Sequence, residues 1–331
     1  MSDRVTVHVD DGVADVRLNR PDKLNALDGD MFVGLVGAAT RLGRDTSVRA
    51  VVLSGEGRSF SAGLDFSGFM AMAGGRVTVD GGGPAVQQGD DDAGGSEAGA
   101  AVAADPSVRA VVLSGEGRAF CAGLDFAGFM AMAGRREGGS GDGIGAIAQT
   151  DGRITHLGQQ VSHVWSEVPV PVIAAIWGHC LGGGLQIALG TDLRIVHPDT
   201  KLSVLEIRWG LTPDMTGTAT LPRLVGPDVA KELTWTGRTV TGEEAVRLGL
   251  ATRTDDDPLA AALSLAGDIA AKSPHAIRGA KRLIDQAPGT DLAAQYADER
   301  TTIGSLVGTP NQVEAVAAFF EKRSPSFADP D

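Results

Sequence analysis

The feature that most constrains the fold is a continuous apolar run that ends in three consecutive glycines, in "PVIAAIWGHCLGGGLQIALGTD". An apolar run without polar alternation predicts a strand that is buried on both faces, as in parallel sheets. The segment after the glycines predicts a helix, in which each glycine costs about 1 kcal/mol relative to alanine. We therefore expect another group to approach the backbone of Gly182–Gly184 closely. A neutral amide, Gln186, follows on the predicted helix.

Strand and helix patterns alternate along the first three quarters of the chain, which predicts a mostly parallel α/β core. The predicted elements are a β-hairpin over 5–20, a helix over 27–45, short apolar strands in 48–55, 108–115, 169–178 and 193–198, and an amphipathic helix over 153–168. After about Ala251 the pattern is wholly helical. We therefore expect a core domain over 1–250 and a C-terminal helical subdomain over 251–331.

The chain contains an internal duplication. Residues 47–74 and 107–134 agree at all but three of 28 positions, which are Ser59/Ala119, Ser61/Cys121 and Ser67/Ala127. A single tandem copy is too short for a solenoid, and we expect the sheet to have one slot for this strand. Copy one has the shorter tether, but copy two is more apolar where the copies differ, which favours copy two for a buried role. The Gly-, Asp- and Ala-rich stretch 75–105 predicts a flexible linker.

Composition excludes several classes of protein. The 331 residues carry a net charge of −13, which argues against nucleic acid or an anionic membrane as the partner. Two cysteines are too few for a disulfide framework. With no apolar leader segment at the N-terminus and no spanning run of apolar residues, the sequence predicts a cytoplasmic protein.

Two glycine-rich turns, "GEGRAFCAGLDF" and "HCLGGGLQ", each follow a predicted buried strand. Backbone N–H groups at such strand-to-helix turns are unpaired and point outward. If the strands are neighbours, two N–H groups converge on one oxygen and stabilise an enolate or a tetrahedral oxyanion. Each turn alone could be purely structural. Neither turn ends in the Lys-Ser/Thr of a phosphate-binding loop, and no dinucleotide fingerprint is present.

These turns, taken with "LSVLEIRWGLTPDMTGTATLPRLVG", "TGRTVTGEEAVRLGLA" and "FFEKRSPSF" in this order, resemble the crotonase, or enoyl-CoA hydratase/isomerase, superfamily. The resemblance covers about Val5 to Phe327 apart from the duplication. It implies an α/β fold with a ββα spiral core and a C-terminal α-helical oligomerisation subdomain. It also implies an acyl-CoA thioester as substrate, with coenzyme A as part of the substrate and no separate cofactor. The oxyanion hole would be the N–H groups of Leu124 (or Leu64 in copy one) and Gly183.

The resemblance also assigns candidate catalytic residues. Hydratases of the family use two glutamates to add water across a double bond, and here the second is Glu206 while the first position holds Gln186. An amide cannot transfer a proton at neutral pH. Asp214 resembles the position of a carboxylate in the family's dienoyl-CoA isomerases, although a turn or helix cap is an equal alternative.

A double-bond shift needs one carboxylate and no activated water, so it tolerates Gln186 better than hydration does. We therefore expect an isomerase with Glu206 as the main base. The alternatives are a 2-enoyl-CoA hydratase of fatty acid β-oxidation, a non-catalytic acyl-CoA-binding homologue, and hydrolysis of the thioester.

The resemblance implies further contacts with coenzyme A. Candidates are Arg118, Ala122 and Asp125 near the first turn, and Phe319 and Lys322 in a segment that often comes from a neighbouring subunit. It implies a homotrimer or a dimer of trimers. A solvated C-terminal lysine is the equal alternative for Lys322.

Other chemistry finds less support in the sequence. The six histidines show no metal-ligand spacing, so no metal is expected. His179 and Cys180 are adjacent on a predicted strand, so they point to opposite faces and do not form a nucleophilic dyad.

Overall fold

The structure is a computed structural model of the 331-residue chain. It describes residues 4–10, 13–23, 25, 31, 38, 50–56, 105–115, 118–121 and 154–330. The predicted helix over 27–45 and the predicted linker over 75–105 lie almost wholly outside the described residues.

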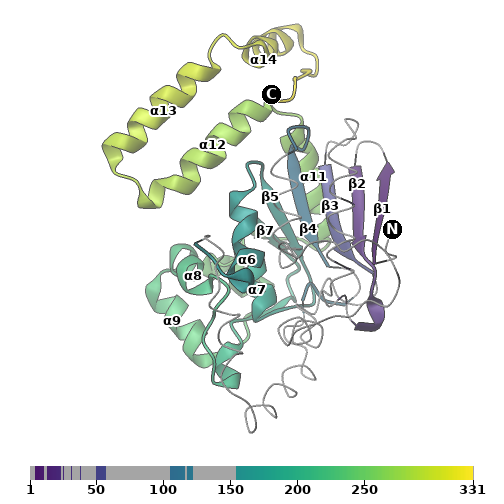
Figure 1. The fold of residues 1–331 in the computed structure, drawn as a ribbon, viewed down its shortest axis with the longest axis vertical. Helices are drawn as coiled ribbons and strands as arrows, with labels where there is room; N and C mark the ends of the chain where they lie inside the picture. Colours follow the sequence, from purple (N-terminus) through teal and green to yellow (C-terminus); the bar gives the residue numbers. More distant parts are fainter. Residues whose placement is uncertain are drawn as a thin grey trace, which may run out of the picture.

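A seven-stranded sheet with the order β1-β2-β3-β4-β5-β7-β9 forms the centre of the molecule (Figure 1). Its strands are β1 (Val5–Asp10), β2 (Val13–Leu18), β3 (Ala50–Gly55), β4 (Ala110–Ser114), β5 (Val172–Ile176), β7 (Leu193–Val196) and β9 (Arg253–Thr254). β1 and β2 pair antiparallel, as the predicted hairpin requires, and every other pair is parallel. The expected α/β core is confirmed.

Both copies of the duplicated strand belong to this sheet, so the expectation of a single slot is wrong. β3 and β4 are parallel neighbours, with Ala50 opposite Ala110 and Leu53 opposite Leu113. The two copies therefore pair in register, so equivalent residues of β3 and β4 project to the same face of the sheet. Of the two described strands, only β4 of copy two pairs with β5, the strand that precedes β6 and the glycine turn.

Helices cover both faces of the sheet. Along β4, Val111 and Leu113 point to the face covered by α6 (Leu157–Glu167) and α7 (Gly183–Leu189). Ala110 and Val112 point to the opposite face, which is covered by α11 (Pro258–Ala270). A strand buried on both sides explains the unbroken apolar run in the sequence.

The smaller elements lie below and beside the sheet. They are η1 (Pro21–Lys23), β6 (His179–Leu181), β8 (Lys201–Ser203), η2 (Glu206–Trp209), α8 (Gly217–Val225), α9 (Pro227–Thr236) and α10 (Gly242–Leu248). β6 and β8 form a separate two-stranded sheet. Among the described residues, no helix is long and apolar enough to span a membrane.

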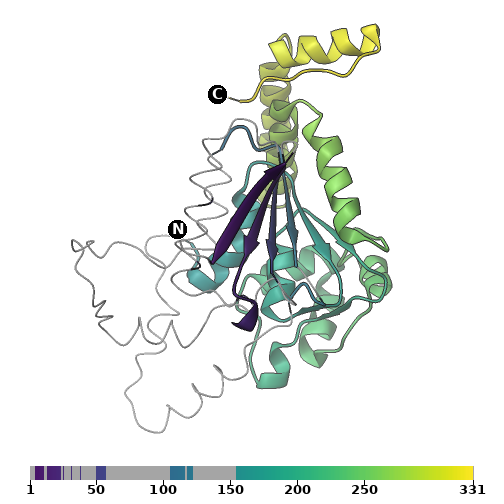
Figure 2. The same ribbon diagram turned by 90° about the vertical axis from the view of Figure 1, so that its right-hand side faces the viewer.

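The C-terminal part begins with a strand, so a wholly helical pattern after Ala251 is wrong. β9 pairs with β7. Because β9 is only two residues long, it leaves no periodic pattern in the sequence. α11 then packs on the sheet, while the next helices project beyond the end of the sheet (Figures 1 and 2). These are α12 (Pro274–Gln286), η3 (Ala287–Gly289), α13 (Leu292–Leu306) and α14 (Pro310–Glu321), which we call the C-terminal arm. The expected domain boundary at residue 250 stays a prediction.

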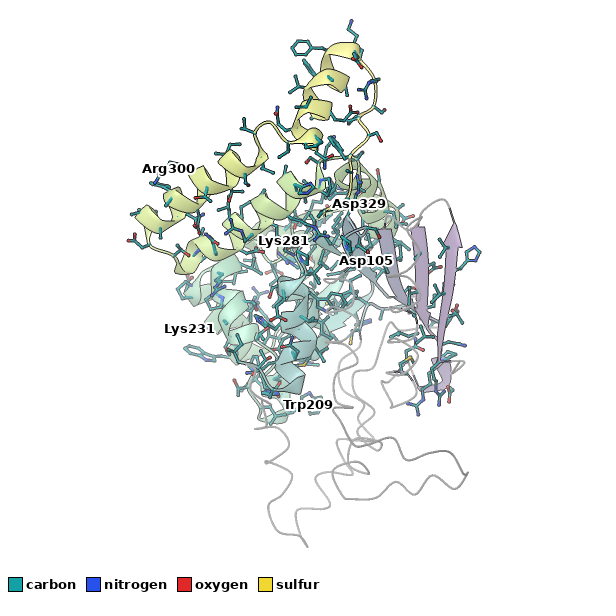
Figure 3. All side chains as sticks on the ribbon, turned by 45° about the horizontal axis from the view of Figure 1, so that its top comes forward. Asp105, Trp209, Lys231, Lys281, Arg300 and Asp329 are labelled. Carbon is teal, nitrogen blue, oxygen red and sulfur yellow. The ribbon has the colours of Figure 1, made fainter. Side chains whose placement is uncertain are left out.

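Two ion pairs fasten the C-terminal arm and tail to the sheet. Lys281 of α12 lies 2.6 Å from Asp192, whose carboxylate also accepts a hydrogen bond from the N–H of Val172. Arg109, just before β4, lies 2.7 Å from Asp329. Figure 3 shows Lys281 and Asp329 where the arm meets the core. The first pair fixes α12 to the start of β7, and the second fixes the C-terminal tail beside the start of β4.

Candidate active site

The structure explains why glycine is needed at Gly182 and Gly184, between β6 and α7, and shows that a flexible side chain lies close to Gly183. Gly182 has φ 53° and ψ −124°, a backbone conformation that residues other than glycine rarely adopt. A Cβ on Gly184 would lie 2.3 Å from Cβ of Cys121, and a Cβ on Gly183 would lie 2.9 Å from Sδ of Met215. The predicted close approach is confirmed, but at Gly184 the approaching group is the protein's own Cys121.

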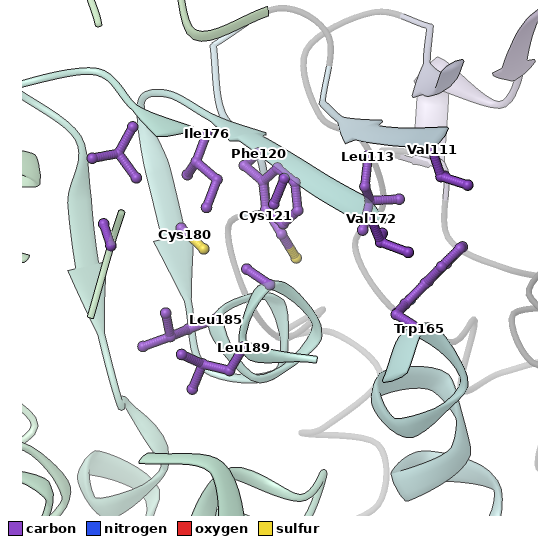
Figure 4. Packing of buried hydrophobic residues seen from close by; sticks show 14 of the residues in the cluster. Val111, Leu113, Phe120, Cys121, Trp165, Val172, Ile176, Cys180, Leu185 and Leu189 are labelled. Atoms are coloured by element: carbon purple, nitrogen blue, oxygen red, sulfur yellow. The ribbon is translucent and has the colours of Figure 1, made fainter. Parts of the chain in front are cut away.

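Copy two of the duplication runs alongside the glycine turn. The N–H of Cys121 donates to the carbonyl of His179 at 2.9 Å, and the N–H of Leu181 donates back to Cys121 at 3.1 Å. Cys121 and Cys180 form an isolated parallel bridge, and Figure 4 shows them between the strands and Leu185 of α7. The predicted neighbourhood of the two turns is thereby confirmed for copy two as far as Cys121. The candidates Ala122, Leu124 and Asp125, and Leu64 of copy one, lie outside the described residues.

Gly183 is the first residue of α7, so its N–H has no acceptor within its own helix. The neighbouring N–H of Gly182 donates to the carbonyl of Ser203 at 3.0 Å. The turn therefore holds its backbone through Gly182 and leaves the N–H of Gly183, at the start of α7, without an acceptor in its own helix.

Gln186 and Glu206 form the polar centre of the site, and both are buried, with exposed fractions of 1% and 8%. Nε2 of Gln186 donates to Oε1 of Glu206 at 2.7 Å. Oε1 of Gln186 accepts from the N–H of Met215 at 2.9 Å and from the N–H of Gly217 at 3.0 Å. Since two backbone donors fix the amide oxygen, the amide nitrogen must face Glu206.

The second carboxylate oxygen of Glu206, Oε2, is open to another hydrogen-bond partner. It is buried and has no hydrogen-bond partner among the described residues. Burial raises the pKa of Glu206, and the nearby charge of Asp214 raises it further. The hydrogen bonds from Gln186 and from the local backbone lower this pKa, but the net shift is upward. A buried carboxylate with a raised pKa and a free oxygen is suited to accept and return a proton.

Asp214 is exposed and does not cap α8, because the residue at the N-cap is Thr216. It acts on Glu206 through its charge. The sequence did not reveal that the backbone N–H groups of Met215 and Gly217 donate to Gln186. Gly217 was the available signal, because a Cβ there would lie 2.7 Å from Oε1 of Gln186.

The prediction for His179 and Cys180 is confirmed. His179 is exposed, whereas Cys180 is fully buried on the other face of β6. Burial raises the pKa of the Cys180 thiol well above its usual value. A buried thiol of this kind is inert as a nucleophile.

The remaining candidates for coenzyme A contact are spread over the surface. Arg118 is exposed, and its carbonyl lies against Gly178. Phe319 is 78% exposed near the end of α14, and Lys322 ends that helix with φ 53°. α14 lies at the far end of the C-terminal arm from α7 (Figure 1), so one chain does not bring Phe319 and Lys322 to Glu206.

Comparison with known proteins decides the family. The sequence model of the family described as "Enoyl-CoA hydratase/isomerase" matches residues 8–78 and 97–330. The chain belongs to the enoyl-CoA hydratase/isomerase family. The resemblance stated above, and the crotonase fold that it implies, are confirmed.

Relatives within the enoyl-CoA hydratase/isomerase family carry hydratase names. A crotonyl-CoA hydratase of Syntrophomonas wolfei subsp. wolfei is 34% identical over 69% of this chain and 83% of its own. A probable enoyl-CoA hydratase of Bacillus subtilis is 32% identical over 67% of this chain and 83% of its own. The crystal structure of a probable enoyl-CoA hydratase/isomerase from Mycobacterium abscessus matches with a TM-score of 0.65 and 26% identity, over 98% of this chain and 99% of that one.

Proposed function

We propose that this chain shifts a double bond within an enoyl-CoA or dienoyl-CoA thioester, with Glu206 as the group that moves the proton. The observation that carries the proposal is the state of Glu206. It is buried, one oxygen is bonded to an amide that cannot titrate, and Oε2 is free to face a substrate C–H. Family membership supports an acyl-CoA substrate.

The reaction balances without water or a cofactor. The Glu206 carboxylate removes a proton from the carbon next to the thioester carbonyl of a 3-enoyl-CoA, and the electron pair delocalises to the carbonyl oxygen as a dienolate. Carboxylic acid Glu206 then returns the proton two carbons further along, which gives the conjugated 2-enoyl-CoA. Asp214 contributes negative charge that keeps the carboxyl of Glu206 basic.

The thioester oxygen would bind the N–H of Gly183 and the N–H of Leu124. We favour Leu124 over Leu64 because copy two pairs with β6 up to Cys121, three residues before Leu124. Two backbone donors at a developing oxyanion contribute about 3–4 kcal/mol each in comparable sites.

Hydration of a 2-enoyl-CoA is the second candidate, and the names of the relatives favour it. In that reaction Glu206 would both activate water and supply a proton, while Gln186 would only position the water. The amide oxygen of Gln186 already accepts from the N–H groups of Met215 and Gly217, so it has no acceptor site left for a water, and only the second N–H of Nε2 could contact one.

For the coenzyme A moiety we propose contacts from Arg118, Ala122 and Asp125 of the same chain, and from Phe319 and Lys322 of a neighbouring copy. The C-terminal arm exposes large apolar side chains that a single chain leaves uncovered. These include Ile284, Leu292, Ile303, Val307, Val313, Phe319 and Phe320. We propose that they are covered in a homotrimer or a dimer of trimers. Location in the cytoplasm stays a prediction, since a mouse relative is named as mitochondrial.

Three substrates separate the candidates: a 2-enoyl-CoA, a 3-enoyl-CoA and a 3,5-dienoyl-CoA, each followed by absorbance. Formation of a conjugated product from the 3-enoyl or dienoyl substrate supports the isomerase. Fast loss of conjugation from the 2-enoyl substrate, with no reaction of the other two, replaces it with the hydratase. Binding of all three without turnover would mean a non-catalytic homologue.

A further inference from the structure

Met215 lies between the glycine turn and the first turn of α6. Its Sδ lies 2.9 Å, and its Cε 3.7 Å, from the position that a Cβ on Gly183 would take. Its Cγ lies 4.0 Å from the position of a Cβ on Gly158. The side chain is half-buried, so it fills the space over the backbone of Gly183 and also faces outward.

The backbone of Met215 is held in place. Its N–H donates to Oε1 of Gln186, and the next residue, Thr216, has φ 73°, a left-handed conformation that is costly for threonine. Such a conformation persists where the surrounding contacts determine it. The side chain of Met215 therefore starts from a fixed point beside Gln186, and only its own rotamers are free.

We infer that Met215 is a specificity-determining residue that limits the length of the acyl chain. This inference rests on the proposed function, in which the thioester oxygen binds the N–H of Gly183. The N–H that would hold the thioester oxygen is one covalent bond from the Cα of Gly183, which Met215 covers, and the acyl group must also reach Glu206 to react. The thioether therefore stands where carbon atoms of a longer chain would continue.

The chemistry of methionine suits this role. An unbranched thioether packs well against apolar chains and fills irregular gaps. Shortening Met215 to alanine removes the atoms that lie against Gly183 and opens room for further methylenes. Each buried methylene contributes about 0.8 kcal/mol, or roughly fourfold in affinity.

The experiment measures Kd by calorimetry for butanoyl-, hexanoyl-, octanoyl- and decanoyl-CoA, which are saturated and cannot react. Unmodified protein is compared with Met215→Ala, with the volume-conserving Met215→Leu, and with Leu224→Ala. Leu224 is a partly buried residue of α8 that packs on the core, so its loss imitates general destabilisation. Thermal unfolding confirms that each variant is folded, and Met215→Val replaces Met215→Ala if the latter is not.

We expect the preference for octanoyl- over butanoyl-CoA to rise about tenfold or more in Met215→Ala, equivalent to two additional buried methylenes. It should stay within about threefold in Met215→Leu and Leu224→Ala, which is less than one buried methylene contributes. An unchanged preference in Met215→Ala, or an equal rise in Leu224→Ala, overturns the inference while leaving the proposed function in place. Failure of every acyl-CoA to bind the unmodified protein overturns both.

Discussion

The carboxamide nitrogen of Gln186 donates a 2.7 Å hydrogen bond to the buried carboxylate of Glu206. This bond orders the base of the proposed reaction with a partner that never titrates. It also gives Gln186 a role at the position where hydratases of the family have a glutamate. In the proposed reaction, Gln186 positions Glu206 and leaves proton transfer to that one group.

Replacing Gln186 by glutamate should change the pH dependence of the reaction. Two carboxylates would then face each other at about the present 2.7 Å and share a proton. We therefore expect the acidic limb of the pH–rate profile to move to higher pH by about 1–3 units. The pair would lose stability as the pH rises through this raised pKa, because its folded-state pKa would exceed the unfolded-state one. Initial rates and urea unfolding at several pH values measure both effects.

Gln160→Glu is the matched control for this substitution. Gln160 is also buried, and it donates to Glu167 at 2.8 Å on α6. The control should lose stability without moving the rate profile. A profile that moves equally in both variants, or in neither, would show that the contact between Gln186 and Glu206 does not tune the base.

Unmodified Glu206 should itself make stability depend on pH. Burial raises the pKa of Glu206 in the folded state, so its contribution to stability is full below the unfolded-state pKa and is lost as pH rises through the folded-state pKa. Glu206→Gln should therefore be more stable than the unmodified protein at about pH 7, and the difference should vanish near pH 4. Chemical unfolding at both pH values checks the sign, and a difference that grows toward acid pH would contradict it.

Gly184→Ala should destabilise the protein by about 1–3 kcal/mol, because the added Cβ would overlap Cβ of Cys121 in a packed region. Gly267→Ala is the matched control. Gly267 lies on the exposed side of α11 with nothing within 4 Å of an added Cβ, so alanine should stabilise there by about 0.5–1 kcal/mol. Urea unfolding measures both. Equal effects would show that close packing at Gly184 does not require glycine.

The duplication offers a test by deletion. Removing residues 47–106 joins Thr46 to Ser107 and should leave a folded, active protein in which β4 pairs directly with β2. Ser54 now donates to Asp15 at 3.5 Å, whereas the buried Ser114 hydroxyl has no partner among the described residues. In the shortened chain Ser114 takes the place of Ser54 beside Asp15. Circular dichroism and turnover measure the result, and an unfolded product would contradict it.

A second deletion, of residues 62–121, gives the same chain with serine in place of Ala119 and Cys121. Both of these positions are buried, at 6% and 4% exposure. A buried hydroxyl without a partner costs about 1–3 kcal/mol. The 62–121 deletion should therefore be the less stable of the two by that order, and equal stability would show that the differences between the copies are neutral.

Local signals in the sequence were sufficient for part of the fold. The apolar run of β5, the amphipathic pattern of α6 and the glycine turn before α7 each depend on neighbouring residues, and each was predicted. The pairing of β3 with β4 and the two-residue strand β9 depend on contacts between distant segments, which no local period encodes.

The site divides in the same way. Family motifs led to Gln186 and Glu206, and the structure places them in contact. The donors from Met215 and Gly217 depend on how α8 begins relative to α7. That geometry arises from tertiary packing, so a single sequence did not reveal it.

Glu206 as the proton carrier is tested by comparing unmodified protein with Glu206→Gln at saturating 3-enoyl-CoA and measuring the rate at which the conjugated product forms. Glutamine preserves the shape of the side chain and an oxygen that accepts from Gln186. We predict a loss of about 10²–10⁴-fold in kcat with acyl-CoA binding retained. A rate within a few fold of the unmodified protein would contradict the assignment of Glu206 as the proton carrier.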